Sequence, residues 1–266
     1  MFPIRGTSPT SNSSGSAKPA GLVVVVGASG AFGRVIAQRL LSEGFDILAV
    51  ARNRSLLEQL QISMPAIRIC TADIASDTAI DAIRNCIGQP VRAIVHGPGV
   101  GVAGGVMDAD LAILNEAVNI KVGGILRVVR AVDAQLQRGA RIIAIGGQYG
   151  LEPTACAASA GVANAALVNV VRQLSLAYGA RGITAHTIAP GPAKTERLNR
   201  VAAIMAERDG TSLDVALDAL RADSSIGAFT TPDQVAWAVS MLLDPHAAAM
   251  TGSTLMLDSG RRRGLP

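Results

Sequence analysis

The sequence predicts a single α/β domain in which helices cover both faces of a doubly wound parallel sheet. Apolar, β-branched runs alternate with helical segments from Gly21 onward, which is typical of chains built from strand–helix–strand units. The first run, "GLVVVVG", ends in a glycine-rich turn that leads into a helix. Hydrophobic residues make up 49% of the 266 residues and charged residues 17%, which is enough apolar surface for one large core.

Seven segments have the length and composition of buried strands. In chain order they are "GLVVVVG", "FDILAVAR", "AIRICTAD", "VRAIVHGPG", "ARIIAIGG", "GITAHTIAPG" and "STLMLDSG".

Helical spacing of apolar residues links these strands. It predicts helices in "GRVIAQRLLSEG", "SLLEQLQIS", "DTAIDAIRNCIG", the long segment 111–139, residues 155–178, "TERLNRVAAIMAERDG", "SLDVALDALRAD" and "TPDQVAWAVSMLLDP". Thr231 before Pro232 is a typical helix start.

The chain divides into a short tail and one domain. Residues 1–20 are rich in Ser, Pro, Gly and Thr and lack the apolar centre of a secretion signal, which predicts a flexible tail. A transit peptide is the alternative, because the tail contains no acidic residue. Residues 21–266 form the predicted dinucleotide-binding domain, and a segment at about 192–230 is expected to form a lid over the substrate.

Composition argues against several other classes of protein. The three cysteines show no paired spacing, which favours reduced thiols in the cytoplasm and argues against a metal site. The net charge is +4, and the arginines are dispersed except at Arg261–Arg263. Three arginines near a chain end are usually solvated, so we expect no nucleic-acid partner. No apolar run is long enough to predict a membrane span.

The glycine turn is the first functional signal. "GASGAFG" places Gly27, Gly30 and Gly33 between the first strand and the first helix. Glycines there allow a tight turn and close approach of the backbone to a pyrophosphate, which the helix N-terminus attracts. The pattern therefore predicts a Rossmann-like site for a nicotinamide dinucleotide.

The residues at the end of the second strand indicate which of two cofactors, NAD(H) or NADP(H), the site prefers. An acidic residue there would bind the ribose hydroxyls of NAD, but the strand ends with Ala51 and then Arg52. Arg34, just after the turn, adds positive charge. Because guanidinium groups suit a 2′-phosphate, the sequence favours NADP(H) over NAD(H).

These motifs together resemble the short-chain dehydrogenase/reductase family over nearly the whole chain from Leu22 to Gly260. "TADI" is similar to the family's segment after the third strand, and "IAPGPAKT" is similar to its loop on the nicotinamide side. The resemblance implies that Asn119 is the family's active-site helix asparagine. The expected cofactor contacts are Gly27, Ser29, Gly30, Ala31, Phe32, Gly33, Arg52, Asn53, Asp73, Ile74, Gly97, Pro98, Gly99, Pro190, Gly191 and Thr195.

The same resemblance exposes departures from the family pattern. After the fourth strand the chain reads "HGPG" where the family usually has Asn-Asn-Ala-Gly. Gly147 stands where the family places a serine, and Ala160 and Asn164 stand where it places a tyrosine and a lysine. In the family the tyrosine donates a proton and the serine polarises the carbonyl. We therefore expect a non-standard proton donor.

Tyr149 is the first candidate for that donor, since it follows the fifth strand at the edge where α/β sheets bind ligands. A loop aromatic that shields the cleft is the alternative. His96 is expected to make a backbone hydrogen bond and not to transfer a proton. Lys121 is expected on a different helix face from Asn119. Lys194, in the loop on the nicotinamide side, is placed to reach a substrate anion.

Two hypotheses remain for function. The first is an NADP(H)-dependent oxidoreductase that acts on a carbonyl or alcohol of a small, largely apolar substrate, with Asn119 and Tyr149 as catalytic residues. The second is a cofactor-binding regulator, a scaffold subunit or a non-redox enzyme on the same fold. In the family, the helix from Ala155 and the helix before it form a subunit interface, so the resemblance implies a homodimer or homotetramer.

Overall fold

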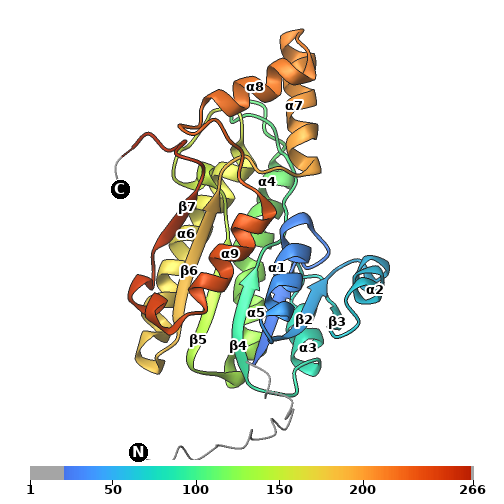
Figure 1. Ribbon diagram of the computed structural model, residues 1–266, viewed down its shortest axis with the longest axis vertical. Coiled ribbons are helices and arrows are strands. Elements are labelled where there is room, and N and C mark those ends of the chain that lie inside the picture. Colours follow the sequence, from blue (N-terminus) through green and yellow to red (C-terminus); the bar gives the residue numbers. More distant parts are fainter. Residues whose placement is uncertain (1–20, 265–266) are drawn as a thin grey trace, which may run out of the picture.

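The computed structural model describes residues 21–264, and the predicted tail at 1–20 lies outside them. The strands are β1 (Leu22–Val26), β2 (Asp46–Ala51), β3 (Arg68–Thr71), β4 (Val91–His96), β5 (Leu136–Ile145), β6 (Thr184–Pro190) and β7 (Thr254–Leu257). They form one parallel sheet in the order β3-β2-β1-β4-β5-β6-β7 (Figure 1). The predicted doubly wound α/β fold is confirmed.

Helices cover both faces of this sheet, as Figure 1 shows. They are α1 (Ala31–Ser42), α2 (Arg54–Ser63), α3 (Thr78–Asn85), α4 (Leu111–Val118), α5 (Gly124–Val132), α6 (Ala158–Tyr178), α7 (Glu196–Asp209), α8 (Leu213–Ala222) and α9 (Pro232–Leu242). Apolar side chains of α1, α2 and α9 pack on one face, and those of α3, α5 and α6 pack on the other. The β1 side chains alternate between these two cores, which explains why the strand is an uninterrupted run of buried apolar residues.

The strand order places a topological switch between β1 and β4. From β1 the chain winds outward through β2 and β3, and it then returns to β4 on the other side of β1. Ligands of open α/β sheets bind outside the carboxyl ends of the strands at such a point. The glycine turn and the "HGPG" segment both lie there, after β1 and β4.

The long helix predicted for residues 111–139 is confirmed over residues 111–135, although with an irregular turn inside it, and is wrong at residues 136–139. Helix α4 ends at Val118, a five-residue π-helical turn (η1) spans Asn119–Gly123, and α5 ends at Val132. One 3-10 turn, η2 (Asp133–Gln135), then leads directly into β5. The strand begins early because Leu136 pairs with Val91 across a register shift, so tertiary pairing overrides the helical pattern.

Helices α7 and α8 have a small apolar cluster of their own and extend from one end of the molecule (Figure 1). The cluster includes Leu198, Ala202, Ala206, Ala216, Leu220 and Phe229. Ile204, on α7 within the expected lid segment, is 61% exposed. The role of residues 192–230 as a lid stays a prediction.

Two local predictions have clear outcomes. The start of α9 is confirmed, because Thr231 and Gln234 form a reciprocal capping box ahead of the helix. Cys156 was expected to pack, but it is exposed and precedes α6, which begins at Ala158. None of the helices within residues 21–264 combines the length and hydropathy that a bilayer crossing needs.

Candidate cofactor and active site

The glycine turn leaves no space for larger side chains. Gly27 has a φ of +78°, and a Cβ there would lie 3.0 Å from the backbone of Gly97 and Pro98. A Cβ on Gly33 would lie 2.2 Å from the carbonyl oxygen of Gly27. Helix α1 therefore starts directly against β1, with Gly30 at its N-cap. This arrangement fits a pyrophosphate, which needs close backbone approach and a helix N-terminus.

The arginines predicted to select the cofactor are available on the surface. Arg34 on α1 and Arg52 after β2 are exposed, and neither forms an ion pair within residues 21–264. Arg54, two residues further on, is paired with Glu58 at 2.8 Å. The side chain of Asn53 accepts a hydrogen bond from the Leu56 N–H and so caps α2. Asn53 thus has a structural partner, whereas Arg34 and Arg52 have none in the described chain.

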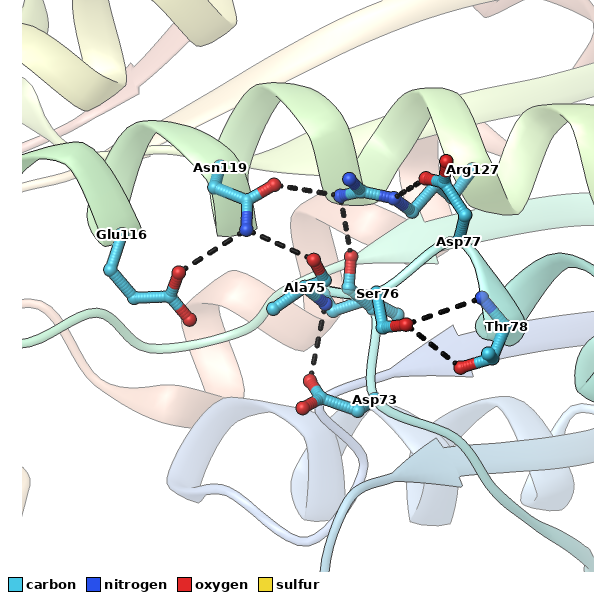
Figure 2. Close-up of polar contacts among 9 residues, drawn as sticks. Asp73, Ala75, Ser76, Asp77, Thr78, Glu116, Asn119 and Arg127 are labelled. Atoms are coloured by element: carbon cyan, nitrogen blue, oxygen red, sulfur yellow. Dashed lines mark hydrogen bonds and ion pairs between the residues drawn. The ribbon is translucent and has the colours of Figure 1, made fainter.

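Figure 2 shows a polar cluster that ties the segment after β3 to the π-helical turn. Asn119 donates from Nδ2 to the Ala75 carbonyl at 3.0 Å and to Glu116 at 3.2 Å, and its Oδ1 accepts from Arg127 at 2.8 Å. Arg127 also donates to the Ile74 carbonyl and pairs with Asp77. The side chain of Asn119 is therefore held at the loop after β3, and its catalytic role stays a prediction.

The predicted adenine neighbours lie on the same loop. Asp73 is exposed, and its carboxylate accepts a hydrogen bond from the Ala75 N–H at 3.1 Å. Ile74 is buried, and its side chain would be 2.9 Å from a Cβ placed on Gly124. The close packing of Gly124 against Ile74 holds α5 against this loop.

His96 ends β4 inside the protein. Its Nε2 lies 3.2 Å from the Ile120 carbonyl, so the expected backbone hydrogen bond is confirmed. Burial, and then the charge of Lys121, lower its pKa to about 3, and the ring is neutral at physiological pH. Gly97, Pro98 and Gly99 follow it directly, beneath the glycine turn.

The loop after β5 packs against the first turns of α6. Gly147 has no room for a side chain, because a Cβ there would lie 2.9 Å from Nδ2 of Asn164. A Cβ on Gly150 would lie 2.7 Å from the Asn164 backbone. Tyr149 is half-buried in the 3-10 turn η3 (Gln148–Gly150) between them. Gly147, Tyr149 and Asn164 are thus brought together.

Two buried side-chain oxygens at this edge have no hydrogen-bond donor within the described residues: Oε1 of Gln148 and Oδ1 of Asn164. Oε1 of Gln148 would be 3.1 Å from a Cβ on Gly191, so it lies against the loop after β6. Buried polar atoms are normally paired. These two amides therefore mark a place where a bound ligand can complete the hydrogen bonding.

The predicted nicotinamide-side loop leads from β6 into α7. The Gly191 N–H donates to the Leu257 carbonyl, and the backbone passes close to Asp258. Thr195 is the N-cap of α7, and its hydroxyl donates to the Ala193 carbonyl at 3.2 Å. Pro190 is the last residue of β6. Lys194 is exposed beside them.

Lys121 is a residue that sequence reasoning set aside. It lies in the π-helical turn, is 5% exposed, and donates from Nζ to the Ile145 carbonyl at 2.7 Å, where β5 ends. Burial, and then the charge of Arg197, lower its pKa to about 7. A lone lysine within the apolar run "AVNIKVGGIL" was the available signal. As predicted, it lies on a different face from Asn119, but its face is the one directed at the sheet edge.

The arginines near the C-terminus are not simply solvated, which corrects the sequence-based expectation. Arg261 donates to the Leu220 carbonyl and pairs with Asp223, so it holds the end of α8. Arg262 pairs with Glu152 at 3.2 Å. These contacts connect the last part of the chain to α8 and to the loop before α6.

All three cysteines are free thiols. Within residues 21–264, no group of three His, Cys, Asp or Glu side chains is arranged to hold a metal ion.

Known proteins are similar to this chain in sequence. An uncharacterized short-chain type dehydrogenase/reductase of Sinorhizobium fredii is 26% identical over 249 residues, which cover 91% of this chain. The chain spans only 44% of that relative's length. The 2-(S)-hydroxypropyl-CoM dehydrogenase 3 of Xanthobacter autotrophicus is 26% identical over 250 residues, covering 90% of this chain and 95% of the relative.

A solved structure is similar as well. The crystal structure of a blue fluorescent protein from a metagenomic library, in complex with NADPH, matches with a TM-score of 0.76 and 26% identity. The match covers 92% of this chain and 99% of that chain. The family model described as Enoyl-(Acyl carrier protein) reductase matches residues 27–262, well over half of the sequence. On this evidence the chain belongs to the short-chain dehydrogenase/reductase family.

Proposed function

We propose that this protein is an NADP(H)-dependent oxidoreductase that interconverts a carbonyl and an alcohol on a small, largely apolar substrate. The glycine turn is the observation that carries the proposal, because Gly33 has no room for a Cβ beside the Gly27 carbonyl. Such a turn places the N-terminus of α1 at the sheet's switch point, where a dinucleotide pyrophosphate fits. When bound, the nicotinamide supplies or accepts the hydride.

The preference for NADP(H) rests on Arg34 and Arg52. Arg34 on α1 and Arg52 directly after β2 are exposed and have no ion-pair partner in the described chain. Guanidinium groups bind phosphate through paired, charge-assisted hydrogen bonds. The position after β2 carries no carboxylate for the ribose hydroxyls, because Ala51 precedes Arg52.

Residues of the β5–α6 region hold the substrate carbonyl in this proposal. The alkoxide that forms during reduction needs a proton, which Gly147, Ala160 and Asn164 have no group to supply. Tyr149 is the phenol beside them, and we assign it as the proton donor. The amide group of Gln148 is placed to orient the carbonyl.

A second candidate function is cofactor binding without turnover. It is favoured by the contacts of Asn119, whose amide is occupied by Ala75, Glu116 and Arg127. In that case the protein would be a cofactor-sensing regulator, a scaffold subunit or a non-redox enzyme.

We further propose that the protein is a homodimer or homotetramer. Leu111 on α4 and Leu176 on α6 are 70% and 68% exposed, and Val162 on α6 is 48% exposed. Helices α4 and α6 pack against each other, so their outer faces form one exposed surface. Light scattering after size-exclusion chromatography measures the assembly, and a monomer would contradict this point.

Two measurements separate these functions. Calorimetric titration with NADPH and NADH tests the cofactor site, and we expect NADPH to bind more tightly. Turnover of NADPH with a panel of ketones and aldehydes then tests for chemistry, and we expect Tyr149→Phe to lower kcat. Binding without turnover supports the second candidate. Undiminished turnover in Tyr149→Phe removes the phenol from the mechanism, and absence of binding by either cofactor contradicts the proposal as a whole.

A further inference from the structure

Two cationic side chains bind backbone carbonyls at the carboxyl ends of the neighbouring strands β4 and β5, and neither has an acidic partner within residues 21–264. Lys121 reaches this edge from the π-helical turn and binds the carbonyl of Ile145, the last residue of β5. Arg197 reaches it from α7 and donates from Nη1 to the Val100 carbonyl, in the loop after β4, at 2.8 Å. Each cation is thus bound only to a backbone carbonyl among the described residues.

Both cations are withdrawn from water. Lys121 is 5% exposed, and burial lowers the pKa of the Arg197 guanidinium. A buried charge is costly unless an opposite charge accompanies it, and two like charges side by side increase that cost. Neighbouring groups do not pair with these two cations, because His96 on β4 is neutral and Glu196 on α7 pairs with Arg200 at 3.8 Å. An arrangement of this kind fits an anion that is supplied from outside the chain.

The position of the pair identifies the source of that anion. The cofactor pyrophosphate fits the glycine turn after β1, whereas Ile145 ends β5, which is two strands away. At the usual strand spacing this separation is about 10 Å, which exceeds the size of a pyrophosphate contact. Lys121 instead lies at the end of β5, which leads into Gly147 and the loop of Tyr149, on the side where the proposed function places the substrate carbonyl, and Arg197 binds the loop after the neighbouring strand β4.

We propose that Lys121 and Arg197 together bind a carboxylate group of the substrate, which makes the substrate an oxo acid or hydroxy acid. This inference rests on the proposed function for the position of the reacting carbonyl. A carboxylate suits the pair because its two oxygens can accept hydrogen bonds from a guanidinium and an ammonium at the same time. Arg197 belongs to α7, so binding of the anion also draws this helix toward the sheet.

Protonation gives the proposal a distinctive signature. With a pKa of about 7, a fraction of the Lys121 side chains is neutral at pH 7.5. An adjacent carboxylate stabilises the ammonium and raises that pKa, so binding takes up protons. A neutral ligand at the same place takes up none.

The experiment compares acids with their methyl esters. Acetoacetate, 4-oxopentanoate and benzoylformate, each paired with its methyl ester, are titrated calorimetrically into the wild-type protein with and without NADP. Titrations at pH 7.5 in two buffers with different ionisation enthalpies report proton uptake. We expect at least one acid to bind more than tenfold more tightly than its ester, with uptake of a fraction of a proton.

Three variants test whether Lys121 and Arg197 cause the tighter binding of the acid. Lys121→Met and Arg197→Gln should each weaken binding of the acid at least tenfold and leave the ester unchanged, and Lys121→Met should abolish the proton uptake. Arg200→Gln is the matched control on α7, since Arg200 is exposed and pairs with Glu196. Circular dichroism checks the fold of each variant, and Arg197→Gln keeps the test valid if Lys121→Met does not fold.

The inference is overturned if no acid binds more tightly than its ester, or if both substitutions leave the preference intact. NADPH binding is measured separately on the same samples. A protein that binds NADPH but shows no acid preference retains the proposed function and loses this inference. A protein that binds the acids but not NADPH retains the anion site and loses the proposed function.

Discussion

The side-chain oxygen of Asn119 lies 2.8 Å from Nη1 of Arg127, and the same guanidinium nitrogen binds the Ile74 carbonyl (Figure 2). This contact joins the π-helical turn, α5 and the loop after β3. It gives Asn119 a structural task that can be separated by experiment from a catalytic one.

We predict that Asn119→Ala lowers the free energy of unfolding by about 1–3 kcal/mol, because the Ala75 carbonyl and Arg127 lose a partner. Urea unfolding measures this change. Arg127→Gln should have a similar effect, and the two losses should not add in the double variant, since both remove the same contact. At saturating cofactor and substrate, a fall in kcat of more than about a hundredfold in a folded Asn119→Ala protein would instead favour a catalytic role, since amides that donate hydrogen bonds to developing charge contribute effects of that size.

Cofactor selection should depend on the surface charge after β2. Arg52→Gln removes a guanidinium with no partner in the described chain, so it should weaken NADPH binding about 10- to 100-fold, the equivalent of about 1.5–3 kcal/mol for hydrogen bonds to a charged group. NADH binding should not change, and calorimetry measures both. Arg54→Gln is the matched control, because Arg54 is exposed and already paired with Glu58. Equal losses for NADPH and NADH would contradict the assignment.

Packing at the glycine turn should tolerate no methyl group. Gly33→Ala would place a Cβ 2.2 Å from the Gly27 carbonyl, so the start of α1 must shift. We expect a loss of about 1–3 kcal/mol in stability together with loss of cofactor binding. Gly88→Ala is the control, since a Cβ there meets no atom within 4 Å. Normal NADPH affinity in Gly33→Ala would show that the turn does not hold the cofactor as proposed.

Stability should fall in acid because of His96 and His186. Burial lowers their pKa values to about 3 and about 4, so between these values and about 6.5 the unfolded chain binds protons that the folded chain does not. The contribution of these two rings to stability is therefore full above about pH 6.5 and is lost as the pH falls toward 4, by up to about 1.4 kcal/mol per pH unit for each ring. Urea unfolding from pH 7 to pH 4.5 measures the slope. His96→Asn should flatten it and His246→Asn, at an exposed site, should not; equal slopes in both variants would contradict this reading.

Much of the fold could be predicted from local patterns. The run Leu22–Val26 is apolar throughout because its side chains enter cores on both faces of the sheet, and β2, β4 and β5 likewise contribute side chains to both cores. Gly33 could be assigned because its close neighbour, the Gly27 carbonyl, lies within the same turn, whereas the contact of Gly27 with Gly97 and Pro98 depends on the pairing of β1 with β4. The start of β5 could not, since residues 136–139 become a strand only through pairing with β4.

The site depends more on contacts between distant segments. Helical spacing correctly places Asn119 and Lys121 on different faces, but it does not say which face meets the sheet. In the structure the side chain of Asn119 contacts the loop after β3, and the side chain of Lys121 contacts the end of β5. Arg197 could not be linked to Lys121 from sequence at all, because the link depends on how α7 folds back toward the loop after β4.

Transfer of deuterium tests the proposed oxidoreductase activity most directly. NADPH labelled with deuterium at C4, on either face of the ring in separate reactions, is incubated with the protein and a carbonyl panel that includes the oxo acids named above. Mass spectrometry then examines the alcohol products. The account predicts that one of the two labelled cofactors, and not the other, transfers its deuterium to the carbon that was the carbonyl carbon of the substrate and is the alcohol carbon of the product. NADPH that binds tightly yet labels no product across the panel would contradict it.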